Sequence, residues 1–298
     1  MKFYLLRNLV AALATLLMVG WGAAAFSQGA PHRRPQAAPH AEPAANNSPR
    51  GEAARGEPAR SEPRLAKRLP GDVTTEHVLT LSDRTVHFKA TAGFIPLFDA
   101  ESGAEQAEIA YIAYVRSDVD PATRPVTFVF NGGPGAASAY LQLGAVGPWR
   151  LPLEQATPSS PPDVVPNTDT WLDFTDLVFV DPVGTGYSRF ITTNDSTRRH
   201  FWSVDGDAEV LAVMVRKWIE KAGRQLSPKF LLGESYGGFR LPKIAGELQG
   251  SQGVGVSGLV LVSPVLDFGW AGDGRHSPMA YVTRLPSMAA TALEEKGK

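Results

Sequence analysis

The pentapeptide Gly-Glu-Ser-Tyr-Gly at residues 233–237 constrains the fold of this chain more than any other feature. It matches the pattern G-x-S-x-G and joins two segments of different periodicity. The apolar run at 229–232 is typical of a buried strand, and residues 238–248 have the apolar spacing of a helix. Glycines beside the serine let a strand and a helix approach closely through a sharp turn, because no Cβ collides. We therefore predict a strand–turn–helix unit with Ser235 at the tip of the turn.

The segments before and after this unit predict a mixed sheet. Residues 74–81, 84–98 and 108–116 are β-rich and tend to alternate polar with apolar side chains, which predicts an antiparallel opening meander. Short apolar runs typical of buried strands follow at 126–130, 177–180, 230–232 and 256–262. Because helices alternate with these runs, we expect a three-layer α/β domain whose sheet is mostly parallel.

One long helix is predicted between the strand at 177–180 and the strand that leads into the serine turn. Residues 204–221 place large apolar side chains at i, i+3, i+4, i+7 and i+8, and these residues are Leu211, Met214, Val215, Trp218 and Ile219. This spacing forms a single apolar stripe, for which packing against the core is a sufficient explanation.

The first 27 residues are typical of a secretory signal peptide. A positively charged start is followed by an apolar core at 9–20, and small residues precede an expected cleavage site before Gln28. The alternative is an uncleaved membrane anchor, because the apolar run is almost long enough to span a bilayer. We expect cleavage, a periplasmic or extracellular location, and no stable membrane span afterwards.

A composition shift marks the boundary of the folded domain. Residues 28–70 are rich in Pro, Ala, Arg and Glu and have almost no large apolar side chains, so we expect a disordered linker. Residues 71–298 are long enough for one domain with a substantial core. We expect this domain to be incomplete at its C-terminal end, before the last strands of the sheet.

Charge and composition exclude several classes of function. The net charge of −1 indicates no nucleic-acid partner, and the absence of cysteine excludes disulfides, a thiol nucleophile and a cysteine-based metal site. Residues 253–258 match G-x-G-x-x-G but lead into a strand, whereas a dinucleotide motif follows one. No metalloprotease or Walker motif is present either, so we expect no cofactor and no metal. The oligomeric state is left open by the sequence.

A second glycine-rich turn suggests what Ser235 does. Asn-Gly-Gly-Pro-Gly at 131–135 follows a predicted strand, where it can supply a backbone N–H that stabilises a developing oxyanion. In a strand–serine–helix unit the other N–H belongs to the residue after the nucleophile, here Tyr236. We therefore predict that Ser235 is a nucleophile and that Gly133 and Tyr236 form its oxyanion hole.

Three motifs together resemble the serine carboxypeptidases, peptidases that remove residues from a peptide C-terminus. The motifs are NGGPG at 131–135, DPVGTGYS at 181–188 and GESYGG at 233–238, and the resemblance extends over about residues 84–267. It implies an α/β-hydrolase fold, and it implies that Ser235 forms an acyl-enzyme. We expect Asp181 and Tyr187 in the second motif to shape a turn, so neither is placed in the site.

The resemblance also implies a site for the terminal carboxylate of a peptide. Asn131, Gly132 and Glu234 inherit this substrate-binding role from the family. A carboxylate is repelled by an ionised Glu234, so Glu234 must be protonated to donate a hydrogen bond. The family's usual acidic residue after the first motif is Ala145 here, and its usual tryptophan and cysteine are Val129 and Ala136, which puts strict C-terminal specificity in doubt.

The remainder of a catalytic triad is not evident. In this fold an Asp and then a His follow the serine in the chain, and the candidates after Ser235 are Asp267, Asp273 and His276. None has the expected position, so three functions stay open: a carboxypeptidase, an esterase or acyltransferase of the same fold, and a remnant that binds peptide C-termini without cleaving them. Missing strands would also leave an apolar sheet edge exposed.

Overall fold

A computed structural model describes residues 68–152, 163–268 and 278–297. The chain divides into two compact units, one holding residues 61–271 and the other holding helix α6 (Met279–Glu295). We describe each unit by itself. The predicted signal peptide and most of the predicted linker lie outside the described residues, so the predicted domain boundaries stay predictions.

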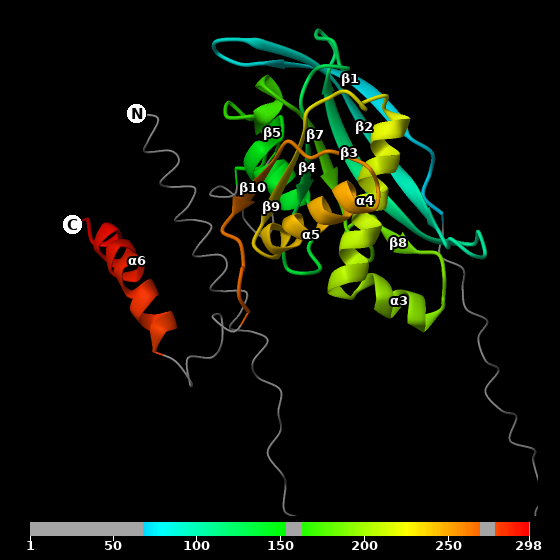
Figure 1. The fold of residues 1–298 in the computed structure, drawn as a ribbon. Coiled ribbons are helices and arrows are strands. Elements are labelled where there is room, and N and C mark those ends of the chain that lie inside the picture. The colour runs from blue at the N-terminus through cyan, green and yellow to red at the C-terminus, as the bar shows by residue number, and fades with distance from the viewer. Residues whose placement is uncertain (1–67, 153–162, 269–277, 298) are drawn as a thin grey trace, which may run out of the picture. The chain divides into compact units, whose positions relative to one another are not determined.

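The unit of residues 61–271 is built on one mixed sheet with the strand order β1-β2-β3-β7-β4-β9-β10 (Figure 1). Its strands are β1 (Val73–Thr80), β2 (Thr85–Phe98), β3 (Glu105–Arg116), β4 (Val126–Phe130), β7 (Asp176–Val180), β9 (Lys229–Glu234) and β10 (Gly258–Val262). Pairing from β1 through β3 to β7 is antiparallel, and pairing from β7 through β4 and β9 to β10 is parallel. The predicted meander and the predicted parallel strands are both confirmed.

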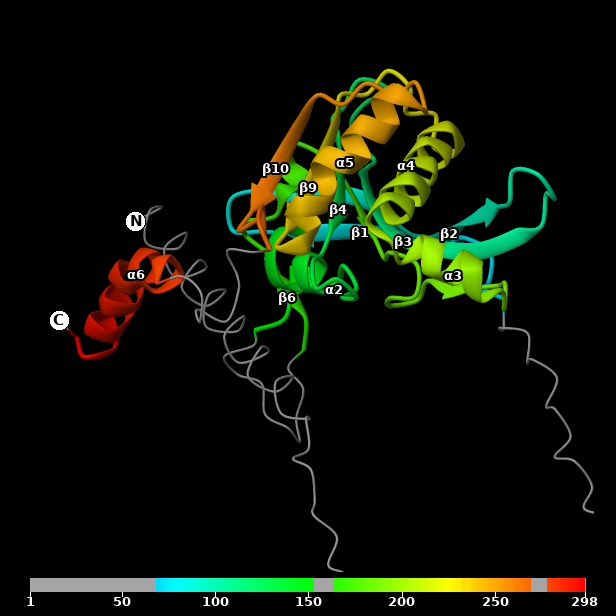
Figure 2. The ribbon, with the colours of Figure 1, turned by 60° about the horizontal axis from the view of Figure 1, so that its bottom comes forward.

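Helices cover one face of this sheet, and alternate strand residues form the core beneath them. The elements on this face are α3 (Asp195–Phe201), α4 (Val204–Lys221) and α5 (Tyr236–Gly250), and Figure 2 shows α4 and α5 running beside each other. Phe128 of β4 and Leu231 of β9 belong to one buried cluster with Trp218 of α4. The central strands β4 and β7 are buried at every position, as expected for parallel strands packed on both faces.

The opposite face is covered by shorter elements. These are α2 (Ala139–Leu141), a π-helical turn η1 (Gln142–Val146) and a 3₁₀ turn η3 (Trp171–Asp173). Val129 and Leu232 point to this face and cluster with Leu141 and Leu172. A two-stranded ribbon, β5 (Trp149–Arg150) with β6 (Val165–Pro166), and the short strand β8 (Arg189–Phe190) beside β3 complete the unit.

Helix α4 has the bounds that the apolar stripe predicts. Ser203 caps its N-terminus by accepting a hydrogen bond from the backbone N–H of Gly206 at 3.1 Å. Asp205 and Asp207 lie in the first turn, where a carboxylate complements the helix dipole. The cap, the helix dipole and the apolar stripe therefore all favour a helix over this segment.

Several short elements were not predicted, and α5 begins earlier than expected. Helix α3, η1 and β8 are too short to carry a periodic signal. Helix α5 starts at Tyr236, directly after the serine, and α6 falls within the predicted C-terminal helical stretch. No helix in the described ranges is both long and apolar enough to cross a membrane.

Strand β10 is the outermost strand at its side of the described sheet. It pairs with β9, and Leu259 and Leu261 remain 38% and 40% exposed. The expected apolar edge is therefore present in the described part of the chain.

Candidate active site

Ser235 occupies a sharp turn between β9 and α5. Its backbone has φ 57° and ψ −119°, in the region that favours glycine. The turn is held by backbone hydrogen bonds, because Ser235 N donates to Val262 O at 2.9 Å and Ser235 O accepts from Val265 N at 3.2 Å. The strand–turn–helix unit predicted from G-x-S-x-G is thus formed, with the serine at its tip.

The glycines of this turn are required by close packing. A Cβ added to Gly233 would lie 2.5 Å from the carbonyl carbon of Gly237. A Cβ added to Gly237 would lie 2.4 Å from the carbonyl oxygen of Phe130, at the end of β4. Any side chain here would push the helix away from the strands, which is the physical reason for the motif.

The glycine-rich turn after β4 lies directly against the serine turn. A Cβ added to Gly132 would lie 2.6 Å from Glu234 O and 2.8 Å from the Cβ of Ser235. The same Cβ would lie 2.9 Å from the backbone nitrogen of Tyr236. Gly133 follows with φ 111°, a conformation that favours glycine. Gly132 thus meets Glu234, Ser235 and Tyr236, three residues that the sequence placed in the same site.

Glu234 and Asn131 are both buried beside these turns, each 5% exposed. Burial raises the pKa of the Glu234 carboxyl, and a hydrogen bond from the backbone of Gly132 opposes this shift. The Asn131 side-chain oxygen accepts a hydrogen bond from the backbone of Leu141 at 3.3 Å. Because that oxygen is engaged, the amide nitrogen is the end of Asn131 that is left to donate to a ligand.

Arg240 joins the two turns, and sequence reasoning missed it. It is buried on α5, where Nε donates to Asp207 of α4 at 2.5 Å and Nη1 donates to Asn131 O at 3.2 Å. Its guanidinium also lies 5.0 Å from the ring centroid of Tyr236. Burial raises the pKa of Asp207, and the charge of Arg240 opposes this shift. Arg240 could have been identified from the sequence, because it is a charged residue on the apolar side of the helix that follows the serine.

Asp181 of the second motif organises the turn beside the site. Its carboxylate accepts a backbone hydrogen bond from Ser138 at 2.9 Å and another from Tyr187 at 3.1 Å. Burial is the main cause of its raised pKa. Tyr187 itself is 70% exposed. These contacts support the expectation that both residues shape a turn.

No general base is placed beside Ser235 by the described residues. The histidines in the described ranges lie on β1, β2 and α3, and none follows β9 or β10. His200 of α3 contacts Glu209, with 3.2 Å between the side chains. Asp267 lies in the segment after β10, whereas Asp273 and His276 lie outside the described residues. The described residues also contain no cluster suited to hold a metal ion.

The strand order, the serine turn and the glycine-rich turn after β4 define an α/β-hydrolase fold with a nucleophile elbow. The chain belongs to the serine carboxypeptidase family, because the family model for serine carboxypeptidases matches residues 81–267. The predicted family and fold are therefore confirmed, over nearly the same range as the sequence motifs indicated.

Curated relatives agree with this family assignment. Serine carboxypeptidase-like 16 of Arabidopsis thaliana is 29% identical over 189 residues, which cover 61% of this chain and 41% of that protein. The pheromone-processing carboxypeptidase KEX1 of Yarrowia lipolytica is 34% identical over 146 residues, which cover 48% of this chain and 22% of that protein. The chain spans less than half the length of the curated relatives it matches.

Solved structures resemble the chain more remotely. The peroxisomal α/β-hydrolase Lpx1 of Saccharomyces cerevisiae is 15% identical with a TM-score of 0.33, over 66% of this chain and 45% of that one. A bacterial heroin esterase is 15% identical with a TM-score of 0.36, over 61% of this chain and 47% of that one. Scores this low carry no weight, so the fold assignment rests on the family match and the strand order.

Proposed function

We propose that this protein is a serine-type carboxypeptidase that cleaves peptides from their C-termini through an acyl-enzyme on Ser235. The observation that carries the proposal is the close contact of Gly132 with the serine turn. This contact gathers the nucleophile, two candidate oxyanion donors and two candidate carboxylate ligands at the ends of adjacent strands β4 and β9. Family membership supports the same reaction.

In the proposed reaction, the Ser235 hydroxyl attacks the carbonyl of the last peptide bond. The backbone N–H groups of Gly133 and Tyr236 stabilise the oxyanion of the tetrahedral intermediate. Collapse of the intermediate releases the C-terminal amino acid, and water then hydrolyses the acyl-enzyme. A general base must take the serine proton, and no described residue beside the elbow fills this role.

Specificity for a free C-terminus comes from Asn131 and Glu234 in this proposal. The Asn131 amide nitrogen and a protonated Glu234 carboxyl both donate hydrogen bonds to the terminal carboxylate. Burial of Glu234 favours the protonated form. We also propose that the protein is exported, on the strength of the signal-like sequence at 1–27.

A second candidate function is binding of peptide C-termini without cleavage. It is favoured by one observation: Asn131 and Glu234 are both buried beside the serine turn, and they need no general base to bind a carboxylate. An oxyanion hole without a base supports at most weak residual catalysis. The carboxylate-binding residues would then be the functional part of the site. An esterase or acyltransferase of the same fold has no specific observation in its favour.

The test begins with the intact mass of the mature protein isolated from its source, which shows what further chain belongs to it. That protein is then incubated with an N-blocked dipeptide, its C-terminal amide and the corresponding simple ester. Hydrolysis of the free-acid dipeptide, lost in Ser235→Ala, supports the carboxypeptidase. Binding of the free acid over the amide without cleavage supports the second candidate. Cleavage of the ester alone contradicts both.

A further inference from the structure

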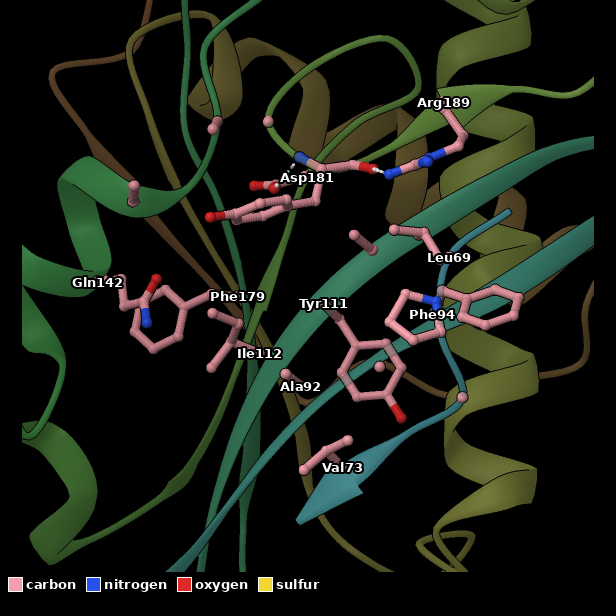
Figure 3. A pocket seen from close by; sticks show the side chains of 18 of the residues that line it. Leu69, Val73, Ala92, Phe94, Tyr111, Ile112, Gln142, Phe179, Asp181 and Arg189 are labelled. Atoms are coloured by element: carbon pink, nitrogen blue, oxygen red, sulfur yellow. Dashed lines mark hydrogen bonds between the residues drawn. The ribbon is translucent and has the colours of Figure 1, made fainter. Parts of the chain in front are cut away.

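A cavity of about 610 Å³ lies on the face of the sheet that carries α2 and η1 (Figure 3). Its lining contains none of the residues Ser235, Gly133 and Glu234, although it includes Asp181, which lies beside the candidate active site. Its volume is within the usual range of about 300–1,000 Å³ for small-molecule sites.

The floor of this cavity is made of strand residues, and those on β2 and β3 are only partly covered. Ala92, Ile112 and Phe179 are paired across β2, β3 and β7 and therefore point to one face. The next row on that face pairs Phe94 with Ala110. Ala92 is exposed, and Phe94 and Ile112 are only partly buried, although they lie in the interior of the sheet. Apolar side chains in the middle of a sheet are normally covered, so this floor is open to a ligand.

Two segments form the sides of the cavity. One side is lined by residues 69–71, which precede β1, and by Val73, its first residue. The other side is lined by Ala137, Ala139 and Gln142. Figure 3 shows Gln142 and Phe179 facing Leu69 and Phe94 across the floor. The second side continues directly from the glycine-rich turn.

The polar groups near the sides already have partners within the protein. Gln142 Nε2 donates to the Tyr114 hydroxyl at 2.7 Å. The Tyr111 hydroxyl donates to Asp72 at 2.7 Å. These groups therefore gain little from a polar ligand.

Charged groups also lie at the ends of the cavity, and each has partners within the protein. Arg189 Nη2 donates to Tyr187 O at 3.4 Å. The Asp181 carboxylate accepts the two backbone hydrogen bonds from Ser138 and Tyr187. Arg68 pairs with the buried carboxylate of Glu108, with 2.8 Å between Nε and Oε1. A charged ligand would lose its hydration against the apolar floor, which offers it neither a hydrogen bond nor a counter-charge.

We infer that this cavity is a binding site for an uncharged, mainly apolar small molecule, one with an aromatic or alkyl body. The proposed binding site does not include Ser235, Gly133 or Glu234. The inference therefore does not depend on the proposed catalysis. Apolar area removed from water supplies the binding free energy.

The test uses the full chain and two matched fluorescent probes, neutral N-phenyl-naphthylamine and its sulfonated counterpart, anilinonaphthalene sulfonate. We expect saturable binding of the neutral probe and weaker binding of the sulfonated one, because only the second must desolvate a charge. Ala92→Phe fills the floor, and Ala92→Asp places an unpaired carboxylate there. Each should weaken binding of the neutral probe by about tenfold or more, since Phe fills the space that the probe needs and Asp adds a charge that the bound probe would bury.

The matched controls are Ala104→Phe and Ala104→Asp, in the turn between β2 and β3. Ala104 is exposed and outside the cavity, so both controls should bind like the parent. Far-ultraviolet circular dichroism checks that each variant is folded. The test can be carried out with either Ala92 variant alone if the other does not fold. Absence of saturable binding, unchanged affinity in the Ala92 variants, or tighter binding of the sulfonated probe would overturn the inference.

Discussion

Ser235, the proposed nucleophile, has a strained backbone. A residue with a Cβ at φ 57° and ψ −119° costs about 1–3 kcal/mol, and the surrounding hydrogen bonds and glycine contacts hold it there. The strain presents the hydroxyl at the tip of the turn. In the proposed function, stability and activity therefore make opposite demands on this one residue.

Replacing Ser235 with glycine should stabilise the fold while removing the proposed nucleophile. Relief of about 1–3 kcal/mol of strain exceeds the entropic cost of glycine, which is about 0.4–1 kcal/mol. We expect Ser235→Gly to be more stable than Ser235→Ala by about 1 kcal/mol in urea unfolding, from the difference of these terms. Ser196→Gly and Ser196→Ala, in the ordinary helix α3, provide the control pair and should show the opposite order. Equal stability of the two Ser235 variants would mean that the turn is unstrained.

Glu234 should make binding of a free C-terminus dependent on pH. Burial raises its pKa, and only the protonated form can donate to a carboxylate. Binding of a free C-terminal carboxylate is therefore present below the raised pKa of Glu234 and is lost as pH rises through that pKa. Above that pKa we expect affinity for an N-blocked dipeptide to fall by about tenfold per pH unit, measured by calorimetry.

Glu234→Gln cannot lose a proton, so its affinity should persist at higher pH. The amidated dipeptide serves as the control ligand, because it carries no carboxylate and should show no such decline. Identical pH profiles for parent and Glu234→Gln would remove Glu234 from the proposed carboxylate site.

At the scale of elements, Asp181 fastens the start of α2 to the turn that follows β7. Its carboxylate satisfies backbone N–H groups from Ser138 and Tyr187, which are far apart in sequence. Gly186 lies so close that an added Cβ would be 2.1 Å from the Asp181 carboxylate. The turn therefore depends on this one side chain for its shape.

Asp181→Ala leaves two backbone donors without acceptors and should destabilise the protein by about 2–3 kcal/mol. Asp181→Asn keeps one acceptor oxygen and should cost about half as much. Unfolding in urea measures both. As a control, Asp118→Ala removes a surface carboxylate that pairs with Arg116 and should change stability by less than about 1 kcal/mol. Similar stability of Asp181→Ala and the parent would show that water replaces these bonds.

At the scale of the whole molecule, the sheet presents β10 as an outer strand. Leu259 and Leu261 remain partly exposed there, and an exposed apolar edge favours association between chains. Leu261→Lys places a charge on this edge and should slow aggregation of the full chain several-fold, followed by light scattering. Leu226→Lys is the matched control, because Leu226 is 83% exposed and lies outside the sheet. If both variants aggregate equally slowly, net charge rather than the edge is responsible.

Much of the fold was predictable because its signals are local. The bounds of β4 and α4 follow from a short apolar run and from a capped apolar stripe, both of which depend on neighbouring residues only. The elbow and the turn at 131–135 were predictable for a similar reason, since glycine is the residue that tolerates their close contacts. The short elements α3, η1 and β8 were missed because they contain too few residues to show a period.

The sequence by itself determined the family, the turn that presents Ser235, and the order of the main strands and helices along the chain. Only the tertiary structure decided which distant side chains meet. Arg224, at 1% exposure, donates to Asp176 at 2.6 Å across 48 residues of sequence, and Arg240 reaches back to Asn131. Such pairs carry no local signal, because burial of a charge is stable only where the fold brings its partner to it. The row that runs from exposed Ala92 through partly buried Ile112 to buried Phe179 is likewise a product of strand pairing, which no single segment encodes.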